Sequence, residues 1–320
     1  MKAYWRGVAA CLALAWLALP AAAQTVKYPH QNVTLVTHSS PGGGSDVFLR
    51  ELIKHLQPVM GTNFAVENVR GGSGAKAVAQ VAKAPADGTM LYATTPTYIQ
   101  TTLLSKPEMG YKDLDPIVIV FFDPELLYTR ADAPWKTLKE AVEYAKANAG
   151  KAHWGAANPA SLERISLERL SRLAGVKVPV VSHEGGADLM INVLNGTLDM
   201  GVGEAQEIRA QLDAGKIRLL GTLTEARLAD FPDLQTAKEQ GFDLVVRKFR
   251  GLAGPKGIPD DIAAAWHKAL QAVVASPAYK EQIAKDSLVV SLMGREEARK
   301  FTTEFAEDIE SSLKELGVVK

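Results

Sequence analysis

The segment best suited to chemistry is a glycine-rich loop, Ser39-Ser40-Pro41-Gly42-Gly43-Gly44-Ser45-Asp46, between a predicted strand and a predicted helix. Three consecutive glycines let a ligand approach the backbone closely. The helix start behind them offers unpaired N–H groups and a positive dipole end, which favour an anion. The loop is neither a Walker loop nor a dinucleotide fingerprint, because no lysine follows and the glycine spacing differs. Two interpretations stay open at this point, an anion site and a tight turn.

A second glycine loop, Arg70-Gly71-Gly72-Ser73-Gly74, follows the next predicted strand. Neighbouring parallel strands would place both loops at the carboxyl edge of one sheet, where α/β proteins bind ligands. Arg70 either adds a positive charge there or is a solvated surface residue.

Two similar segments occur in the second half of the chain, Gly155-Ala156-Ala157-Asn158-Pro159-Ala160-Ser161 and Glu184-Gly185-Gly186-Ala187-Asp188. Each alone is typical of a helix cap. Together they predict a cleft with anion-accepting helix starts on both walls.

Other kinds of site have little support. The six histidines show no metal-ligand spacing, and the only cysteine, Cys11, lies in a predicted export signal. Ser39 and Ser45 lack the G-x-S-x-G pattern that presents a nucleophilic serine. We therefore expect no metal, no cofactor and no enzymatic activity.

The elements that position these loops alternate between apolar runs and amphipathic segments, which predicts an α/β fold with largely parallel sheets. Roughly ten strand candidates exceed one sheet of typical size, so two lobes with a cleft between them are expected. The predicted strands are 33–37, 64–66, 90–94, 178–181, 200–202 and 219–222. The predicted helices include 47–56, 75–81, 260–274 and 295–316.

Helix-capping patterns set several boundaries. Asp46 is expected to cap the first helix, and Thr137-Leu138-Lys139-Glu140 reads as a capping box with Gly150 as the helix stop. Ser161 is expected to start a helix that turns Leu162, Ile165, Leu170 and Leu173 inward and stops at Gly175.

The N-terminus predicts export. Lys2 and Arg6 precede an apolar run over 8–19, and Ala21-Ala22-Ala23 forms a small-residue cleavage site before Gln24. The run is too short to span a membrane. Because 36 basic residues balance 36 acidic ones, the chain has no electrostatic footprint for nucleic acid.

An ordered set of motifs resembles the Bug family, the extracytoplasmic solute receptors of tripartite tricarboxylate transporters. The motifs run from Val33–Asp46 through Val66–Asn68, Pro85–Gly88 and Gly196–Asp199 to Phe249–Pro259. The resemblance implies a two-lobed periplasmic-binding-protein fold (type II-like) in which the chain crosses twice between the lobes. Lobe 1 would combine 24–121 with 247–320, and lobe 2 would span 122–246, after a signal peptide over 1–23.

The resemblance also implies a ligand site for carboxylated solutes, held by backbone amides, small hydroxyls and bridging waters. The residues carried over to this chain are Ser39, Ser40, Gly42, Gly43, Gly44, Ser45, Asp46, Gly72, Ser73, Thr95, Asn158, Ser161, Gly185, Gly186 and Glu204, with Arg250 as an added cation. Arg250 either pairs with a carboxylate or braces the hinge.

The chain departs from the family pattern at the pocket wall, where Ser39 replaces the usual phenylalanine. The identity of the solute is therefore open. We predict a monomeric periplasmic receptor that delivers an organic mono-, di- or tricarboxylate to a permease of this transporter class. The alternatives are a sensory co-receptor that presents the solute to a signalling ectodomain and an extracytoplasmic enzyme.

Overall fold

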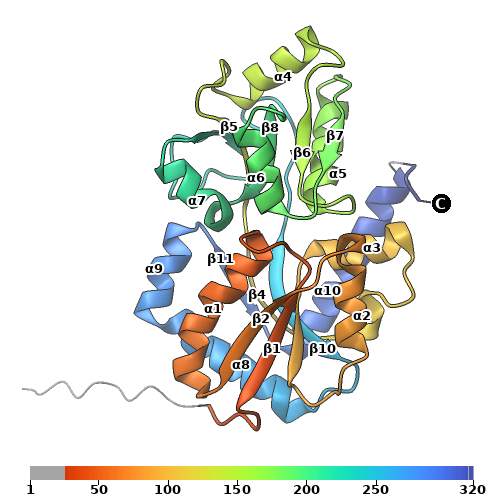
Figure 1. The fold of residues 1–320 in the computed structure, drawn as a ribbon, viewed down its shortest axis with the longest axis vertical. Coiled ribbons are helices and arrows are strands. Elements are labelled where there is room, and N and C mark those ends of the chain that lie inside the picture. Colours follow the sequence, from red (N-terminus) through yellow and green to blue (C-terminus); the bar gives the residue numbers. More distant parts are fainter. Residues whose placement is uncertain (1–25, 316, 320) are drawn as a thin grey trace, which may run out of the picture.

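The computed structural model describes residues 26–315 and 317–319, so the predicted signal peptide and Leu316 lie outside the described residues. The described chain forms two lobes, each with its own β-sheet and its own covering helices (Figure 1). The predicted two-lobed α/β fold is confirmed.

The first lobe is built on a mixed sheet. In the described chain it has six strands in the order β11-β4-β10-β3-β1-β2. These strands are β1 (Asn32–Thr37), β2 (Asn63–Asn68), β3 (Met90–Thr94), β4 (Leu114–Phe122), β10 (Phe249–Pro255) and β11 (Val289–Met293). The elements around them are α1 (Gly44–Met60), η1 (Gly72–Gly74), α2 (Ala75–Ala82), α3 (Pro96–Ser105), η2 (Tyr111–Asp113), α8 (Asp260–Ala275), α9 (Pro277–Lys285) and α10 (Arg295–Glu315).

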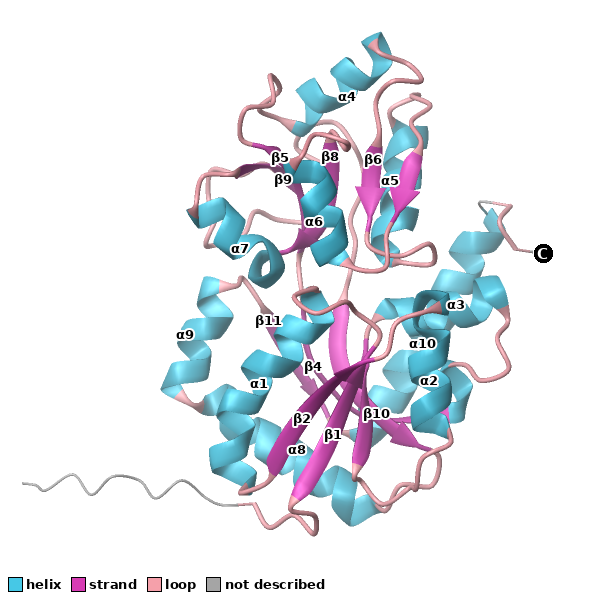
Figure 2. Ribbon diagram, in the orientation of Figure 1, coloured by secondary structure: helices cyan, strands magenta, loops and turns pink. Residues whose placement is uncertain are grey.

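The second lobe is contiguous in sequence. Its described strands have the order β7-β6-β8-β5-β9. They are β5 (Glu125–Arg130), β6 (Trp154–Ala156), β7 (Val180–Ser182), β8 (Met200–Glu204) and β9 (Ile217–Thr222). Figure 2 shows its helices around this sheet: α4 (Leu138–Ala147), α5 (Leu162–Leu173), α6 (Gly186–Leu194) and α7 (Ala205–Asp213).

The chain passes between the lobes twice, from β4 to β5 and from β9 to β10. The two crossing segments are joined, because the Asp123 N–H donates a hydrogen bond to the Lys248 carbonyl oxygen (2.8 Å). The prediction of largely parallel sheets is wrong. Strands that return from the opposite lobe run against their neighbours, so β10 is antiparallel to both β3 and β4, and β5 is antiparallel to β8 and β9.

The two predicted glycine loops do lie at one sheet edge. β1 and β2 pair in parallel from Asn32–Asn63 to Thr37–Asn68, so the loops after Thr37 and Asn68 start side by side. β3 is parallel to β1 as well, which brings Thr95 to the same edge. The carboxyl edge of this sheet faces the second lobe (Figure 1).

Some predicted caps differ in the structure. Gly43, not Asp46, is the N-cap of α1, and Asp46 in the first turn accepts a hydrogen bond from the Gly42 N–H (2.8 Å). Thr137 caps α4 as predicted, but Glu140 accepts from the Lys136 N–H, and the helix ends at Ala147, before Gly150. Ser161 caps α5 as predicted, yet Leu173, the last residue of this helix, is exposed and does not turn inward.

Within the described residues, no helix combines the length and apolar character that crossing a membrane requires.

Candidate functional site in the cleft between the lobes

The residues that converge from both lobes enclose a small cavity. It is lined by His38, Ser39, Gly44, Ser45, Thr95 and Thr97 of the first lobe, by Ala157, Asn158, Glu163, Gly186, Glu204 and Glu207 of the second, and by Lys248 and Arg250 at the second crossing. Its volume is about 20 Å³, enough for about one water molecule. The lobes are therefore closed on each other, and a solute can enter only when they separate.

Half of the predicted site residues line this cavity: Ser39, Gly44, Ser45, Thr95, Asn158, Gly186, Glu204 and Arg250. The other predicted residues do not line it: Ser40, Gly42, Gly43, Asp46, Gly72, Ser73, Ser161 and Gly185. Ser73, for example, accepts a hydrogen bond at its carbonyl from the Thr101 hydroxyl (2.7 Å). Whether these residues contact a solute stays a prediction.

The amides of the triple-glycine loop all have partners within the protein. The Gly42 N–H donates to Asp46, and the Gly43 N–H donates to the Ser40 carbonyl oxygen (2.9 Å). The Gly44 N–H, at the start of α1, donates to Oε1 of Glu207 on α7 (2.9 Å). A carboxylate from the second lobe thus lies on the helix start of the first.

Lys248 binds three carboxylates of the second lobe. Its Nζ lies 2.9 Å from Glu125 Oε1 and also contacts Glu163 and Glu204. Lys248 and Glu125 are almost fully buried. Burial opposes the charge on Lys248, but attraction to Glu125 and Glu163 outweighs it and raises the pKa of Lys248. The lysine ammonium therefore stays charged.

Carboxylate oxygens of Glu125, Glu163 and Glu204 lie within 4.8 Å of one another, as in many metal sites. Here the ammonium of Lys248 lies among them and supplies the positive charge that a cation would bring. The three glutamates therefore bind the Lys248 ammonium, and their arrangement does not support a metal centre.

Arg250 on β10 links both lobes and the crossing segment. Its Nε donates to Asp123 (2.9 Å), its Nη1 donates to the Ser45 hydroxyl (2.8 Å), and its Nη2 lies 2.8 Å from Glu204. Its side chain is 1% exposed. Of the two roles predicted for Arg250, this geometry supports the hinge brace.

Ionisation in the cleft follows from burial and from these pairs. Burial opposes the charge on Glu163, but Lys248 outweighs it and lowers the pKa of Glu163 to about 2. Burial raises the pKa of Glu125 to about 7. Burial and Arg250 lower the pKa of His38 to about 4, so this imidazole is neutral, and its Nδ1 shares a hydrogen bond with the Tyr92 hydroxyl (2.7 Å).

Glu207 has the opposite shift from Glu163. Burial and repulsion by Glu163 and Glu125 outweigh attraction to Arg250 and raise the pKa of Glu207 to about 8. Within the described residues no cation lies within ion-pair distance of Glu207. At neutral pH the closed cleft therefore holds this side chain as a neutral acid whose carbonyl oxygen accepts from Gly44.

This shift predicts how stability depends on pH. Between about pH 4.5 and 8 the folded chain keeps a proton on Glu207 that the unfolded chain has released, so raising the pH favours unfolding. In the Glu207→Gln variant the amide accepts the same hydrogen bond without titrating. We expect the stability of this variant relative to wild type to increase from pH 5 to pH 8.

The measurement is urea unfolding of both proteins at pH 5, 6, 7 and 8, compared as a difference so that other titrating groups cancel. The difference should rise with a slope below the limit of about 1.4 kcal/mol per pH unit for one proton. A constant difference would mean that Glu207 is ionised in the closed cleft.

Sequence reasoning missed several lining residues, mainly Glu163, Glu207 and Lys248. Glu163 and Glu207 lie in the first turns of α5 and α7, where acidic residues are common helix-terminal features. Lys248 directly precedes the motif that begins at Phe249. The available signal was the position of all three next to strand ends or helix starts at the predicted cleft.

Two further contacts hold the cleft shut. Arg70 of the first lobe donates to Asp188 on α6 (2.7 Å), and Arg209 on α7 donates to the Lys285 carbonyl oxygen at the end of α9. Gly185 packs so tightly against Ser40 that a Cβ at residue 185 would collide with the Ser40 hydroxyl. Of the two interpretations of Arg70, the structure shows a partly exposed residue that bridges the lobes.

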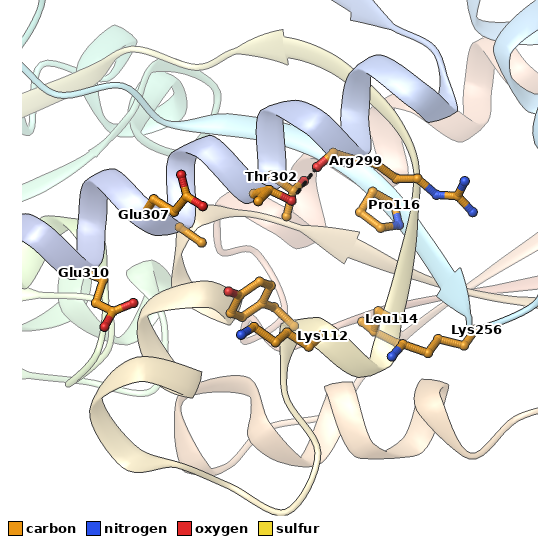
Figure 3. Close-up of a pocket in the computed structure, with 11 residues that line it drawn as sticks. Lys112, Leu114, Pro116, Lys256, Arg299, Thr302, Glu307 and Glu310 are labelled. Carbon is orange, nitrogen blue, oxygen red and sulfur yellow. Dashed lines mark hydrogen bonds between the residues drawn. The ribbon is translucent and has the colours of Figure 1, made fainter.

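A larger cavity of about 520 Å³ lies on the first lobe, away from the cleft. Figure 3 shows Thr302, Glu307 and Glu310 of α10 on one wall and Lys112 and Leu114 on the other. Three cationic side chains line it, Lys112, Lys256 and Arg299, and Arg299 binds Asp115 through two hydrogen bonds (2.8 and 2.9 Å). Because this cavity involves one lobe only, the cleft is the stronger candidate site.

Comparison with known proteins agrees with this architecture. The family described as tripartite tricarboxylate transporter family receptor matches residues 48–318. A protein from Cupriavidus necator named UPF0065 protein in the gbd 5′ region is 30% identical over 315 residues, which cover 98% of this chain and 95% of that protein.

Two solved structures are similar over almost their whole length. The periplasmic binding protein BugD is 26% identical, with a TM-score of 0.85, and the match covers 92% of this chain and all of that one. R. palustris Rpa4515, described with adipate, is 24% identical with a TM-score of 0.86 over 91% of this chain and 99% of that one.

Proposed function

Because this chain belongs to the receptor family of tripartite tricarboxylate transporters, we propose that it captures an organic carboxylate in the periplasm and delivers it to a permease of that class. Solute binding is the function of the family. We propose three further points: that the solute is a carboxylate, that a permease receives it, and that the protein does not convert it chemically. The proposal includes export directed by the signal peptide over 1–23. It also includes the division into lobe 1, made of 24–121 and 247–320, and lobe 2, made of 122–246. The change from one sheet to the other near Phe122 and Phe249 supports this division.

One observation carries the carboxylate assignment. The Gly44 N–H at the start of α1 already binds a carboxyl group, that of Glu207, in the closed cleft. A helix start is a favourable place for a carboxylate because its first N–H groups have no partner within the helix and its dipole end is positive. The adipate described with Rpa4515 is a ligand of the same chemical class.

The mechanism we infer is closure of the two lobes around the solute. Opening would turn the second lobe about the crossing segments at Asp123 and Lys248, separate Glu207 from Gly44, and break the Arg70–Asp188 pair. A solute that contacts both walls then favours the closed form by its greater affinity for it. The closed pair of lobes would be the surface that the permease recognises.

Charge dependence of binding tests the carboxylate part. We expect the best solute in a calorimetric screen of carboxylates to bind at least tenfold more tightly than its primary amide or methyl ester. Each helix start contributes roughly 0.3 to 1 kcal/mol at exposed sites and up to about 2 when partly buried, and charge-assisted hydrogen bonds add to it. The measurement is paired calorimetry at a pH where the acid is ionised. Equal affinities would contradict recognition of the carboxylate charge.

A further inference from the structure

The cavity of about 520 Å³ on the first lobe lies between α10 and the paired ends of two strands (Figure 3). Leu114 at the start of β4 pairs with Pro255 at the end of β10, so Lys256 follows at the same end of the sheet. On α10 the lining residues recur at intervals of three and four, which places them along one face of the helix: Arg299, Thr302, Thr303, Ala306, Glu307 and Glu310. A cavity of this size fits a small organic molecule.

Two lysines of this cavity have no ion-pair partner within the described chain. Lys112 and Lys256 lie on the wall opposite α10 (Figure 3). Lys112 attracts the Glu310 carboxylate from beyond ion-pair distance, but Glu310 is already paired with Lys314 (2.7 Å). Both ammonium groups can therefore donate to a ligand without leaving a carboxylate behind.

The remaining charges of the lining are largely balanced within the protein. Arg299 pairs with Asp115 (2.8 Å) and with Glu296 (2.7 Å). Glu307 is exposed and forms no ion pair with any described residue. Two positive charges against one negative charge are left unpaired, so the cavity is complementary to a ligand that brings a net negative charge.

Thr302 supplies a buried hydroxyl that the protein does not use fully. Its side chain lines the cavity, the residue is 4% exposed, and its Oγ1 has no hydrogen-bond partner of good geometry. The Tyr98 hydroxyl interacts with it, but that hydroxyl is buried too and has no other partner among the described residues. Two hydroxyls have two donor hydrogens and use only one between them. The second donor remains for an acceptor that enters the cavity, because buried polar groups rarely stay unpaired.

The rest of the wall is apolar. Leu114 and Ala306 are almost fully buried, and Pro116 is half-buried beside them. A ligand that covers these side chains removes apolar surface from water. The cavity therefore combines donors for an oxyanion with a surface for an apolar body.

We propose that this cavity is a second binding site, for an organic anion with an apolar body. Lys112, Lys256 and the Thr302 hydroxyl donate to its carboxylate or phosphate group. The apolar body lies over Leu114, Pro116 and Ala306. The residues that line this cavity and those that line the cleft are different sets, so the inference goes beyond the proposed function and does not depend on it.

The experiment is titration calorimetry of the mature chain at pH 7.5 with four probes: hexyl phosphate, heptanoate, hexanol and inorganic phosphate. We expect at least one of the two organic anions to bind at least tenfold more tightly than hexanol, because hexanol lacks the oxyanion group. Which of the two binds more tightly distinguishes a phosphate site from a carboxylate site. Inorganic phosphate should bind at least tenfold more weakly than the better organic anion, because it has no apolar body.

A double variant tests the two lysines. Lys112→Gln with Lys256→Gln should weaken binding of the better anion at least tenfold. Lys136→Gln with Lys151→Gln is the matched control, since these two lysines of the second lobe are exposed, form no ion pair with a described residue and line neither cavity. We expect the control to bind with unchanged affinity.

A pair of isosteric variants tests the hydroxyl. Thr302→Val should weaken binding about tenfold, because a hydrogen bond to a charged group is lost. Thr303→Val should have little effect, because Thr303 is exposed and its hydroxyl already donates to the Arg299 carbonyl oxygen (3.0 Å). Melting temperatures verify that each variant is folded.

The cleft variant Gly44→Val locates the bound probe, since heptanoate could also enter the cleft. Affinity at the second site should be the same in wild type and in Gly44→Val. Binding that Gly44→Val weakens and the lysine pair does not would place the probe in the cleft and overturn the inference. Hexanol that binds as tightly as both anions, or no binding by either anion, would overturn it as well. None of these results would contradict solute capture in the cleft.

Discussion

Replacing Lys248 by methionine is expected to lower the free energy of unfolding by about 3–5 kcal/mol, because the change leaves buried carboxylates without their cation. Glu125, Glu163 and Glu204 all contact the Lys248 ammonium and are each at most 6% exposed. Methionine has the same length as the lysine side chain up to Cε, so the loss of stability reports the removal of the charged ammonium group. The loss should be smaller at low pH, where the carboxylates accept protons.

Urea unfolding at pH 7.5 measures this effect. Lys238→Met is the control, since Lys238 pairs with Glu225 on the surface, and we expect almost no change in stability there. Adding Glu204→Gln to Lys248→Met should restore part of the loss. A Lys248→Met protein as stable as wild type would show that the three glutamates are already protonated and need no cation.

The second large effect concerns solute binding. Gly44→Val is expected to weaken binding of the best carboxylate by about tenfold to hundredfold, since overpacking a closed site costs about 1–3 kcal/mol. A Cβ at residue 44 would collide with Glu204 Oε2 and lie 2.6 Å from Arg250 Nη2. These two side chains are buried and paired, so moving them aside costs free energy. We expect the substitution to destabilise the closed form, in which Glu204 lies against residue 44.

Gly254→Ala separates this effect from a general loss of packing. A Cβ at Gly254 on β10 would collide with Ile258 in the core of the first lobe, away from the cavity. We expect this control to melt at a lower temperature and yet bind with unchanged affinity. Calorimetry on both variants makes the comparison. If Gly44→Val binds as well as wild type, the start of α1 is a turn without a role in the closed site.

The sequence was sufficient for the parts of the site that depend on local backbone chemistry. The triple glycine after β1 and the glycine loop after β2 were located because such loops have a recognisable composition and follow apolar runs. Positive φ angles at Gly42, Gly71, Gly72 and Gly74 show why those positions hold glycine. At Gly43 and Gly44 the reason is space, because a side chain would meet Ser39 or the Glu204–Arg250 pair.

The acidic cleft could not be predicted in the same way. Glu204 was predicted, but only through the family resemblance. Glu125, Glu163 and Lys248 are far apart in the chain, and nothing local distinguishes them from solvated surface charges. Their burial follows from how the second sheet brings the start of β5, the end of β8 and the start of α5 to one point. The antiparallel strand pairs were missed for a related reason. A strand that re-enters a sheet from the other lobe can run antiparallel to its neighbours, and its apolar pattern does not show the direction in which it runs.

The strand order of the first lobe also determines what a growing chain can fold. β4 lies between β10 and β11, and both of these partners are synthesised more than a hundred residues after it. Until they emerge, β4 has two open edges, and the early part of this sheet contains β3, β1 and β2 alone. The second lobe, whose strands are contiguous, can pair completely beforehand. A ribosome that stalls before Phe249 would therefore release a chain with one finished lobe and one exposed apolar strand, which is a substrate for aggregation or for a chaperone.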